Sequence, residues 1–456
     1  MSETIQTGLQ TNSKSEIRNP KFRIVLTTFG SFGDIHPYMA LAMELQARGH
    51  QPVIATSSLY REKIEGAGIL FAPVRPNLPP PSDQAQELMD RVMEPKTGPR
   101  FLVEELILPY IRDSYADLLE AVQGADLLVS HPATYAGPLV GRKTRMPWIS
   151  TVLAPLSFFS AYDPPTPPFW PWTTKMRVLG PRFMRAVMDL VQSTYRAKPF
   201  NLLREELGIA YYGNPVFAGQ HSPELIIALF SKIFAPPQPD WPKQARIAGF
   251  AFYDGRHERK MPEELMKFLN SGEPPIVFTL GSSAVYVARD FFHESVLAAK
   301  KLRRRAVLLI GDERNRPPDS LSSEILAVDY APYEALLEHG CAMVHHGGVG
   351  TTSQGLRAGI PTLIVPFAFD QSDNAEHARR LGTSRTLYRR HYQAAQVAGE
   401  LDKLLTDPRY SLNARLIGEA LQRENGTKNA CDVIEDFLGL SPANRQRAEL
   451  AYASGN

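Results

Sequence analysis

The stretch HHGGVGTTSQGLRAGIPTLIVPF, His345 to Phe367, carries the features that decide the fold. It follows the apolar run CAMV, 341–344, which is typical of a buried strand, and it continues into a segment with helical periodicity. Glycines let the backbone approach a ligand closely, and the free N–H groups at the start of a helix attract phosphate. His346 can donate to a phosphate oxygen, while Thr351 and Thr352 can cap the helix or reach the ligand. On these residues alone, a diphosphate site and a plain capped turn are equal alternatives.

The next predicted strand favours the ligand site. It reads PTLIVPF, 361–367, and is followed by Asp370 and Gln371. Because parallel strands present their carboxyl ends at one edge of a sheet, these two side chains should lie at the same edge as the glycines. A carboxylate and an amide can accept from and donate to neighbouring sugar hydroxyls. We therefore expect a sugar diphosphate to bind here.

A similar unit is predicted near the N-terminus. The strand FRIVLTT, 22–28, is followed by the loop FGSFGD, an amphipathic segment over 35–50 and a second strand, QPVIATS. This order is a βαβ unit, which builds parallel sheets with helices on both faces. Asp34 closes the loop, where it can act as a helix N-cap or as a general base. The cap is favoured on the residues alone, and His36 is a second candidate base.

The chain length and the order of its segments predict several domains. At 456 residues the chain exceeds what one hydrophobic core usually fills. A proline-rich passage, FAPPQPDWPKQARIAGF, separates the first strand series from a second one that begins at PPIVFTL, 274–280. We predict an α/β fold with a disordered tail (1–20), a first domain (21–240), a linker (241–255), a second domain (256–430) and a C-terminal helix or tail (431–456) that can cross back to the first domain.

Composition narrows the function classes. Apolar residues make up 43% and charged residues 21%, and the formal charge of +2 gives no general reason to expect nucleic acid as a partner. No run of about 18 apolar residues occurs, and the first twenty residues lack the apolar core of a signal peptide. Cys341 and Cys431 fit neither a disulfide framework nor a zinc spacing, which favours a reducing compartment. We expect a cytoplasmic location.

Residues 330–375, YAPYEALLEHGCAMVHHGGVGTTSQGLRAGIPTLIVPFAFDQSDNA, resemble the nucleotide-sugar signature of the family 1 (UDP-glycosyltransferase-like) glycosyltransferases. TTFGSFGDIHPYMALAMELQARGH is similar to that family's N-terminal acceptor-domain loop, and VFTLGSS to the start of its donor domain. The HHGG and DQ region resembles the sterol glucosyltransferases, and the order FAPPQPDWP, FYDG, VFTLGS resembles bacterial glycolipid rhamnosyltransferases. The resemblance implies a GT-B fold, in which two Rossmann-like domains face a central cleft.

The resemblance also implies roles for individual residues. Asp370 and Gln371 would hold the sugar, and Tyr330 with Ala331 would hold the base. Tyr330 stands where plant members have tryptophan, and Gln354 where they have a ribose-binding glutamate. The diphosphate would be bound by residues of two loops: Ser282 or Ser283, His346, Gly348, Gly350 and Thr351.

The resemblance places the base in the first domain. Asp34 falls where plant enzymes have a histidine base and where sterol and several antibiotic glycosyltransferases have aspartate. His36 falls at a usually non-catalytic position. His131, in VSHPATYAG at the end of a predicted strand, can line the acceptor pocket or be an ordinary loop histidine. Three aromatic residues either line an apolar acceptor cleft or simply pack in the core: Phe158, Phe159 and Trp170.

The expected reaction is an inverting transfer of glucose or rhamnose from a UDP- or dTDP-sugar to a hydroxyl, or to an aromatic carbon, of a small apolar acceptor. Phenolics, sterols and lipids are candidate acceptors, and a lipid acceptor would imply peripheral membrane contact. The sequence has no D-x-D pair, so no metal site and no cofactor besides the nucleotide sugar are expected. A non-catalytic nucleotide-sugar binder and a nucleotide-sugar epimerase are the alternatives. A dinucleotide oxidoreductase fits poorly, because the first loop reads GSFG rather than GxGxxG.

Overall fold

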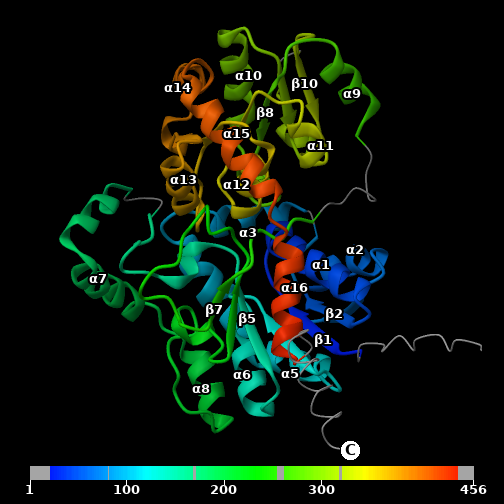
Figure 1. Cartoon of the computed structure of the whole chain (residues 1–456), viewed down its shortest axis with the longest axis vertical. Coiled ribbons are helices and arrows are strands. Elements are labelled where there is room, and N and C mark those ends of the chain that lie inside the picture. The colour runs from blue at the N-terminus through cyan, green and yellow to red at the C-terminus, as the bar shows by residue number, and fades with distance from the viewer. Residues whose placement is uncertain (1–20, 81, 168–170, 254–260, 318–320, 440–456) are drawn as a thin grey trace, which may run out of the picture.

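The computed structural model describes residues 21–80, 82–167, 171–253, 261–317 and 321–439. Within this part of the chain, two parallel sheets with flanking helices form two domains, one above the other in Figure 1. The predicted α/β fold with two Rossmann-like domains is confirmed. The predicted tail, 1–20, and Trp170 lie outside the described residues.

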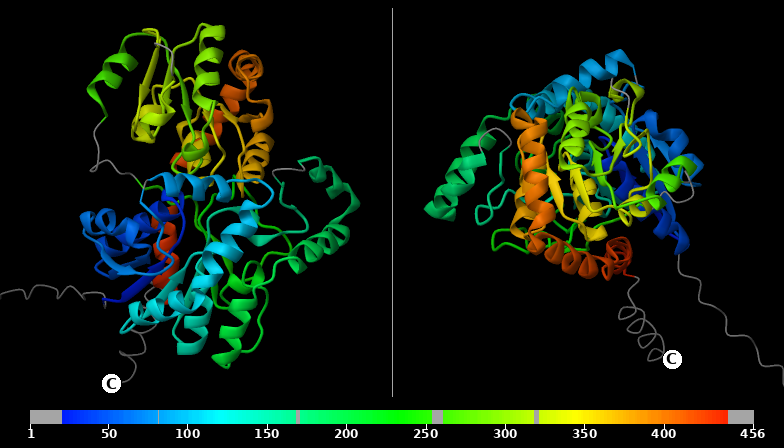
Figure 2. Two further views of the ribbon diagram at one scale, coloured as in Figure 1. Left: turned by 180° about the vertical axis from the view of Figure 1, so that it is seen from behind. Right: turned by 90° about the horizontal axis from the view of Figure 1, so that it is seen from above.

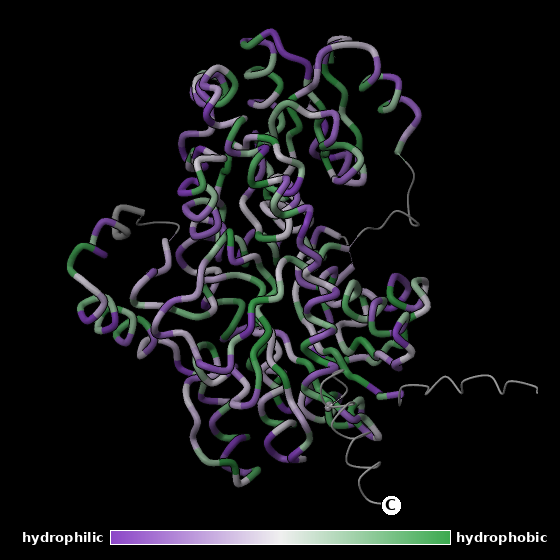
Figure 3. The backbone as a smooth tube through the Cα atoms, in the orientation of Figure 1, coloured by the Kyte–Doolittle hydropathy of each residue, from purple (hydrophilic) through white to green (hydrophobic). Residues whose placement is uncertain are grey.

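The first domain contains a seven-stranded sheet in the order β3-β2-β1-β4-β5-β6-β7. Ile24 and Leu26 of the central strand pack into one apolar cluster and Val25 into another, so both faces of the sheet are covered. This explains the nearly continuous apolar strand sequences, and the strands in the middle of this domain are among the most hydrophobic segments in Figure 3. The strands are β1 (Arg23–Thr27), β2 (Gln51–Thr56), β3 (Leu70–Pro73), β4 (Leu127–Ser130), β5 (Trp148–Val152), β6 (Leu225–Ala228) and β7 (Ala245–Ile247). The helices are α1 (Phe32–Ala47), α2 (Arg61–Gly66), α3 (Asp83–Val92), α4 (Gly98–Phe101), α5 (Ile111–Ala121), α6 (Ala136–Thr144), α7 (Pro181–Ser193) and α8 (Lys198–Glu206).

The second domain contains a six-stranded sheet in the order β10-β9-β8-β11-β12-β13. The order reverses between β8 and β11, which places the loops after these two strands side by side. The strands are β8 (Ile276–Thr279), β9 (Ala306–Leu309), β10 (Ile325–Val328), β11 (Ala342–His345), β12 (Thr362–Ile364) and β13 (Ser384–Thr386). The helices are α9 (Glu263–Asn270), α10 (Phe291–Leu302), α11 (Tyr333–Leu337), α12 (Val349–Ala358), α13 (Gln371–Arg380), α14 (Ala394–Thr406) and α15 (Pro408–Gln422).

The domain boundaries differ from the predicted ones. Strand β7 lies inside the predicted linker, 241–255, yet it pairs with β6 as the last strand of the first sheet. The short strand is only half-buried, so its sequence carries little apolar signal. The last described helix, α16 (Gly426–Phe437), lies on the first domain against α1, as Figures 1 and 2 show. Its Ile434 belongs to the same apolar cluster as Ile35 of α1.

The two domains share an apolar cluster. Phe230 and Phe250 of the first domain pack in it with Leu356 and Ile364 of the second. Helix α3 also joins the domains, because the Gln86 side-chain amide donates a hydrogen bond to the carbonyl of Tyr286. In the described ranges, we find no helix with the length and apolar character needed to cross a membrane.

Candidate active site

The glycine loop after β11 is shaped by His345. Its Nδ1 accepts a hydrogen bond from the Gly347 N–H at 3.1 Å, and burial lowers the pKa of His345 to about 3. Helix α12 begins at Val349 with Gly348 as its N-cap, so the alternative of a turn capped by threonine does not hold. The Thr352 hydroxyl instead donates to the Gly348 carbonyl at 3.0 Å. The first turn of α12 therefore presents backbone N–H groups without a capping side chain.

His346 lies in a narrow space between two glycines. A Cβ atom on Gly281 would lie 2.5 Å from the His346 Cε1, and one on Gly348 would lie 2.5 Å from its Nε2. Burial lowers the pKa of His346 to about 4, so the ring is neutral at neutral pH. Its Nδ1 is buried and has no hydrogen-bond partner among the described residues. A buried ring nitrogen of this kind is suited to a ligand that brings its own donor or acceptor.

The predicted donor residues spread along the carboxyl edge of the second sheet. Ser282 and Ser283 follow Gly281, so their loop is the one that touches His346. Tyr330 is 42% exposed and follows β10 at the edge of the sheet. Ala331 is buried in an apolar cluster, which leaves its backbone as the part available to a ligand. Gly350 and Thr351 lie in the first turn of α12, and Thr351 is nearly buried.

Asp370 and Gln371 occupy different environments. Gln371 is buried, and its amide oxygen accepts from the N–H groups of Phe367 at 2.8 Å and Ala368 at 3.0 Å. It therefore shapes the loop before α13. Asp370 accepts from the Asn374 amide at 2.7 Å, and the same amide donates to the Gly347 carbonyl at 2.9 Å. Asn374 thus ties this loop to the glycine loop, a role that the sequence analysis missed although the residue lies in the quoted DQSDNA motif.

The carboxyl group of Asp370 is influenced by the charge of a residue in the first domain. Burial is the main cause that raises the pKa of Asp370 to about 7, and the negative charge of Asp34 raises it further. Val349, the first residue of α12, packs against the apolar cluster that contains Ile35 of α1, so the start of α12 meets the helix that carries Asp34. The carboxyl ends of the two sheets therefore face one another at this place.

Asp34 is not the N-cap of α1. Ser31 is the N-cap, and Asp34 is the third helical residue of a capping box, in which its Oδ2 accepts from the Ser31 N–H at 2.8 Å. The Thr28 hydroxyl donates to the Asp34 carbonyl at 2.9 Å. Only one carboxylate oxygen is used for the cap, and the side chain is 33% exposed. The second oxygen, Oδ1, is therefore available for another partner.

That partner is His131, which lies in the loop after β4. Its Nε2 lies 3.4 Å from the Asp34 Oδ1, and its Nδ1 accepts from the Ala133 N–H at 3.1 Å. Because Nδ1 is an acceptor, the ring proton of the neutral histidine is on Nε2, the ring nitrogen that lies near Asp34. His131 thus lies beside Asp34, and its role in lining an acceptor pocket stays a prediction. Strands β1 and β4 are neighbours in the sheet, and this adjacency brings the two residues together.

His36 occupies a different position. It lies two residues after Asp34 on the same helix, so the two side chains leave the helix on opposite sides. The ring of His36 stacks on Phe32 at 5.2 Å and on Tyr253 at 4.8 Å between ring centroids. This packing argues against the expectation that His36 is the base.

The predicted acceptor aromatics pack inward. Phe158 is only 8% exposed and stacks on Trp241, with 4.4 Å between centroids, in the cluster shared by both domains. Its predicted acceptor role is wrong, because the loop turns this ring into the core. Phe159 packs edge-to-face on Phe217, at 4.6 Å. The proline-rich loop does reach the second domain, since the Thr166 N–H donates to the Asp373 Oδ1 at 2.9 Å.

The site thus combines a carboxylate on the first domain with a phosphate-type loop on the second. A proton acceptor, Asp34, faces a region bordered by Asp370, and His346 lies beside a helix N-terminus. Such an arrangement can deprotonate one reactant while it stabilises negative charge on another. Within the described ranges, no group of three His, Cys, Asp or Glu side chains is placed to hold a metal ion.

Comparisons with known proteins agree with this geometry. A model of the glycosyltransferase family 28 N-terminal domain matches residues 24–136, and a model of the erythromycin biosynthesis protein CIII-like C-terminal domain matches residues 297–435. The fold and the site therefore define a glycosyltransferase. The O-mycaminosyltylonolide 6-deoxyallosyltransferase of Streptomyces fradiae is 32% identical over 438 residues, which cover 91% of this chain and 97% of that protein. The chain belongs to the family of GT-B glycosyltransferases that contains this enzyme.

Two further relatives extend the comparison. The sterol 3-beta-glucosyltransferase of Leptosphaeria maculans is 29% identical over 426 residues, covering 90% of this chain but 28% of that protein. The chain therefore spans little more than a quarter of the sterol enzyme. The crystal structure of the glycosyltransferase VinC in complex with dTDP superimposes with a TM-score of 0.65 at 20% identity, over 91% of this chain and 99% of that one. This likeness shows the GT-B fold.

Proposed function

We propose that the protein transfers a hexose, glucose or rhamnose, with inversion, from a UDP- or dTDP-sugar to a hydroxyl group of a small apolar acceptor. The observation that carries the proposal is the pairing of Asp34 with His131 at the sheet edge opposite Asp370 and His346. A protein that only binds a nucleotide sugar needs no oriented base on the facing domain. An epimerase acts on the donor alone and needs no second substrate.

The chemistry follows from the two carboxylate oxygens of Asp34. Oδ2 is held by the capping box, while Oδ1 lies 3.4 Å from the Nε2 of His131. Asp34 takes the proton of the acceptor hydroxyl as its oxygen forms a bond to the anomeric carbon. The bond from that carbon to the diphosphate breaks on the opposite face, and its electron pair leaves with the nucleoside diphosphate.

The second domain stabilises the leaving group. The N-terminus of α12 carries a partial positive charge, and the neutral His346 donates a hydrogen bond to a phosphate oxygen. Ser282 or Ser283 adds a hydroxyl from the neighbouring loop. Asp370 accepts from the sugar hydroxyls, positioned by Asn374. We propose that these residues bind the donor without a metal ion. We also propose that the protein acts in the cytoplasm.

The relatives suggest the substrate classes. The Streptomyces relative is named for a deoxyallosyl transfer, and the VinC crystal contains dTDP. A small cavity of about 20 Å³ is lined by Phe29, Val74 and Ile107 together with Thr28, whose hydroxyl donates to the Asp34 carbonyl. The Leptosphaeria relative is named for a sterol acceptor, and we propose a polyketide, phenolic, sterol or lipid as the acceptor class of this protein.

Replacing Asp34 by Asn tests the proposal. The Asn keeps a capping oxygen for Ser31 but loses the basic carboxylate, so we expect kcat to fall by about 100-fold or more. Binding of UDP or dTDP, measured as a rise in melting temperature with EDTA present, should be unchanged. The matched control is Asp126→Asn, which removes a carboxylate that accepts from the Arg23 N–H at the other edge of the same sheet.

The outcomes separate the proposed reaction from its alternatives. Release of nucleoside diphosphate only when an apolar acceptor is present supports transfer, whereas epimerised donor without acceptor supports an epimerase. Full activity in the Asp34 variant would remove the base from the mechanism. Stabilisation by a nucleotide with no turnover for any acceptor would favour a binder.

A further inference from the structure

Helix α7 extends away from the body of the first domain. It lies at the side of the molecule in Figure 1, and the second views show the same projection. The preceding segment is a 3-10 helix over Pro171–Leu179. Neither segment contributes a residue to the site described above, so their sequence pattern needs a separate explanation.

Only half of the apolar face of α7 is buried. Met184 and Met188, one turn apart, are 6% and 8% exposed and form a small cluster with the loop below. Beside them on the helix, Phe183, Leu190 and Val191 are 40%, 69% and 47% exposed. At 100° per residue these three side chains fall on one stripe that adjoins the methionines. An ordinary surface helix would bury this stripe.

The apolar stripe continues into the preceding turn. Val178 is 85% exposed and Leu179 is 57% exposed, the former being the most exposed large apolar side chain among the described residues. We name the five residues together the α7 edge: Val178, Leu179, Phe183, Leu190 and Val191. Clustered exposed apolar side chains of this kind mark an interaction surface.

The charge around the α7 edge is strongly positive. Residues 171–198 contain six basic side chains and one acidic side chain, a net charge of +5, whereas the whole chain has a net charge of +2. The basic residues are Lys175, Arg177, Arg182, Arg185, Arg196 and Lys198. Arg177 pairs with Asp163 at 3.5 Å and Arg185 with Asp240 at 2.9 Å, so counting these two acidic partners lowers the net charge from +5 to +3. An apolar stripe with surrounding lysine and arginine is the pattern of a helix that lies in the interface of an anionic membrane.

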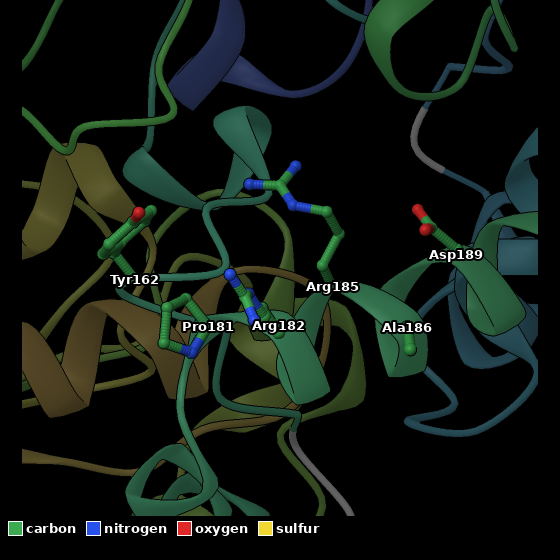
Figure 4. Close-up of a pocket in the computed structure, with 6 residues that line it drawn as sticks. All are labelled: Tyr162, Pro181, Arg182, Arg185, Ala186 and Asp189. Atoms are coloured by element: carbon green, nitrogen blue, oxygen red, sulfur yellow. The ribbon is translucent and has the colours of Figure 1, made fainter.

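A hollow beside α7 adds a place for a headgroup. Its volume is about 280 Å³, and Figure 4 shows its lining residues, among them Arg182, Arg185 and Tyr162. Arg185 is paired with Asp240 at 2.9 Å, and Asp189 is the acidic residue in the lining. Two guanidinium groups three residues apart on one helix can share a phosphate that enters from outside.

We propose that the α7 edge docks on the surface of a lipid bilayer that contains anionic phospholipid. A second copy of the chain fits less well, because a two-fold dimer would place two segments of net positive charge against each other. A bilayer satisfies both features at once, since its acyl region receives the apolar side chains and its phosphates attract the basic ones. This surface is separate from the proposed reaction and does not depend on which acceptor is used.

Vesicle flotation of the full chain tests the proposal. We expect the protein to float with vesicles of phosphatidylcholine mixed with phosphatidylglycerol, and to float much less with phosphatidylcholine alone or at high salt. The double variant Val178→Glu, Leu190→Glu should reduce the bound fraction at least about tenfold. The matched control, Leu412→Glu with Leu416→Glu, changes two residues of α15 that are 49% and 52% exposed, and it should bind like the wild type.

A charge variant and the oligomeric state complete the test. Arg182→Gln should weaken binding to the anionic vesicles while leaving any weak binding to neutral ones unchanged. Melting temperature and dTDP or UDP binding should be the same in all variants, which separates failure of docking from failure of the donor site. The proposal is overturned if the wild type does not float, if both double variants float equally, or if the α7 variant instead converts a dimer into a monomer.

Discussion

Among single residues, the pair of glycines around His346 has the clearest role. Gly281 has a φ of +63°, a left-handed conformation that residues with a Cβ adopt at a cost, and its missing side chain leaves room for the imidazole ring. Gly348 leaves room on the other side of the same ring. The two glycines thus let a histidine be buried at a loop where the backbone must also remain open to a ligand.

Replacing Gly281 by Ala should therefore move His346. The new Cβ would lie 2.5 Å from its Cε1, so we expect nucleoside diphosphate affinity to fall about tenfold or more and the unfolding free energy to fall by about 1–3 kcal/mol. Calorimetric titration and urea denaturation measure the two effects. Gly399→Ala is the control, because this helical glycine in α14 has open space around it and the change should add up to ~1 kcal/mol of stability. Unchanged affinity in the Gly281 variant would contradict the role given to His346.

The raised pKa of Asp370 predicts a pH dependence of stability. In the native protein burial raises the pKa of Asp370 to about 7, whereas an unfolded aspartate titrates near ~3.9. At a pH between these two pKa values, Asp370 is protonated in the native protein and ionised in the unfolded chain. The unfolding free energy therefore falls as the pH rises from about 4 to about 7. The loss is on the order of 2–4 kcal/mol for this group.

Asp370→Asn should remove this contribution. Urea denaturation across that pH range should give a smaller loss of stability for the variant than for the wild type, and the variant should be the more stable protein above pH 7. Parallel pH profiles for the two proteins would show that Asp370 does not titrate in this way.

Among the secondary structure elements, helix α16 crosses back to the first domain, as the sequence allowed, but the surface that it covers there could not be predicted. Arg48 of the first domain pairs with Glu435 and Asp432, both at 2.7 Å, and Gly426 approaches the backbone of Gly249 and Phe250 so closely that a Cβ would lie 2.3 Å from an oxygen. The periodicity of the segment predicts a helix but does not identify the surface that it covers, because that surface is far away in the chain.

Removing the side chain that anchors α16 should destabilise the protein. Ile434 is completely buried, and Ile434→Ala should lower the unfolding free energy by about 2–5 kcal/mol. Asp436→Ala on the exposed side of the same helix is the control and should change it by less than about 0.5 kcal/mol. Equal stability of the two variants would mean that α16 is not docked in solution.

For the molecule as a whole, much of the architecture follows from the sequence. Strands buried on both faces read as apolar runs, and their alternation with helices predicts two parallel sheets. The positions of the donor-binding loops could be predicted, because the carboxyl ends of parallel strands lie at one edge of the sheet. The pairing of Asp34 with His131 could not, since strand order in space is needed to make β1 and β4 neighbours. Phe158 was misplaced because an aromatic ring in a proline-rich loop has the same sequence pattern whether it faces a ligand or a core.

The apolar cluster shared by the two domains has a consequence for recombining the enzyme with its relatives. Leu356, Ile364 and Leu421 of the second domain pack against side chains of the first, and α16 completes the core of the first domain from the end of the chain. A chimera that exchanges one domain at the linker would join mismatched halves of one core. To exchange donor specificity, the transplanted segment must end before Gly426, and the residues of the shared cluster must be exchanged or kept as a set.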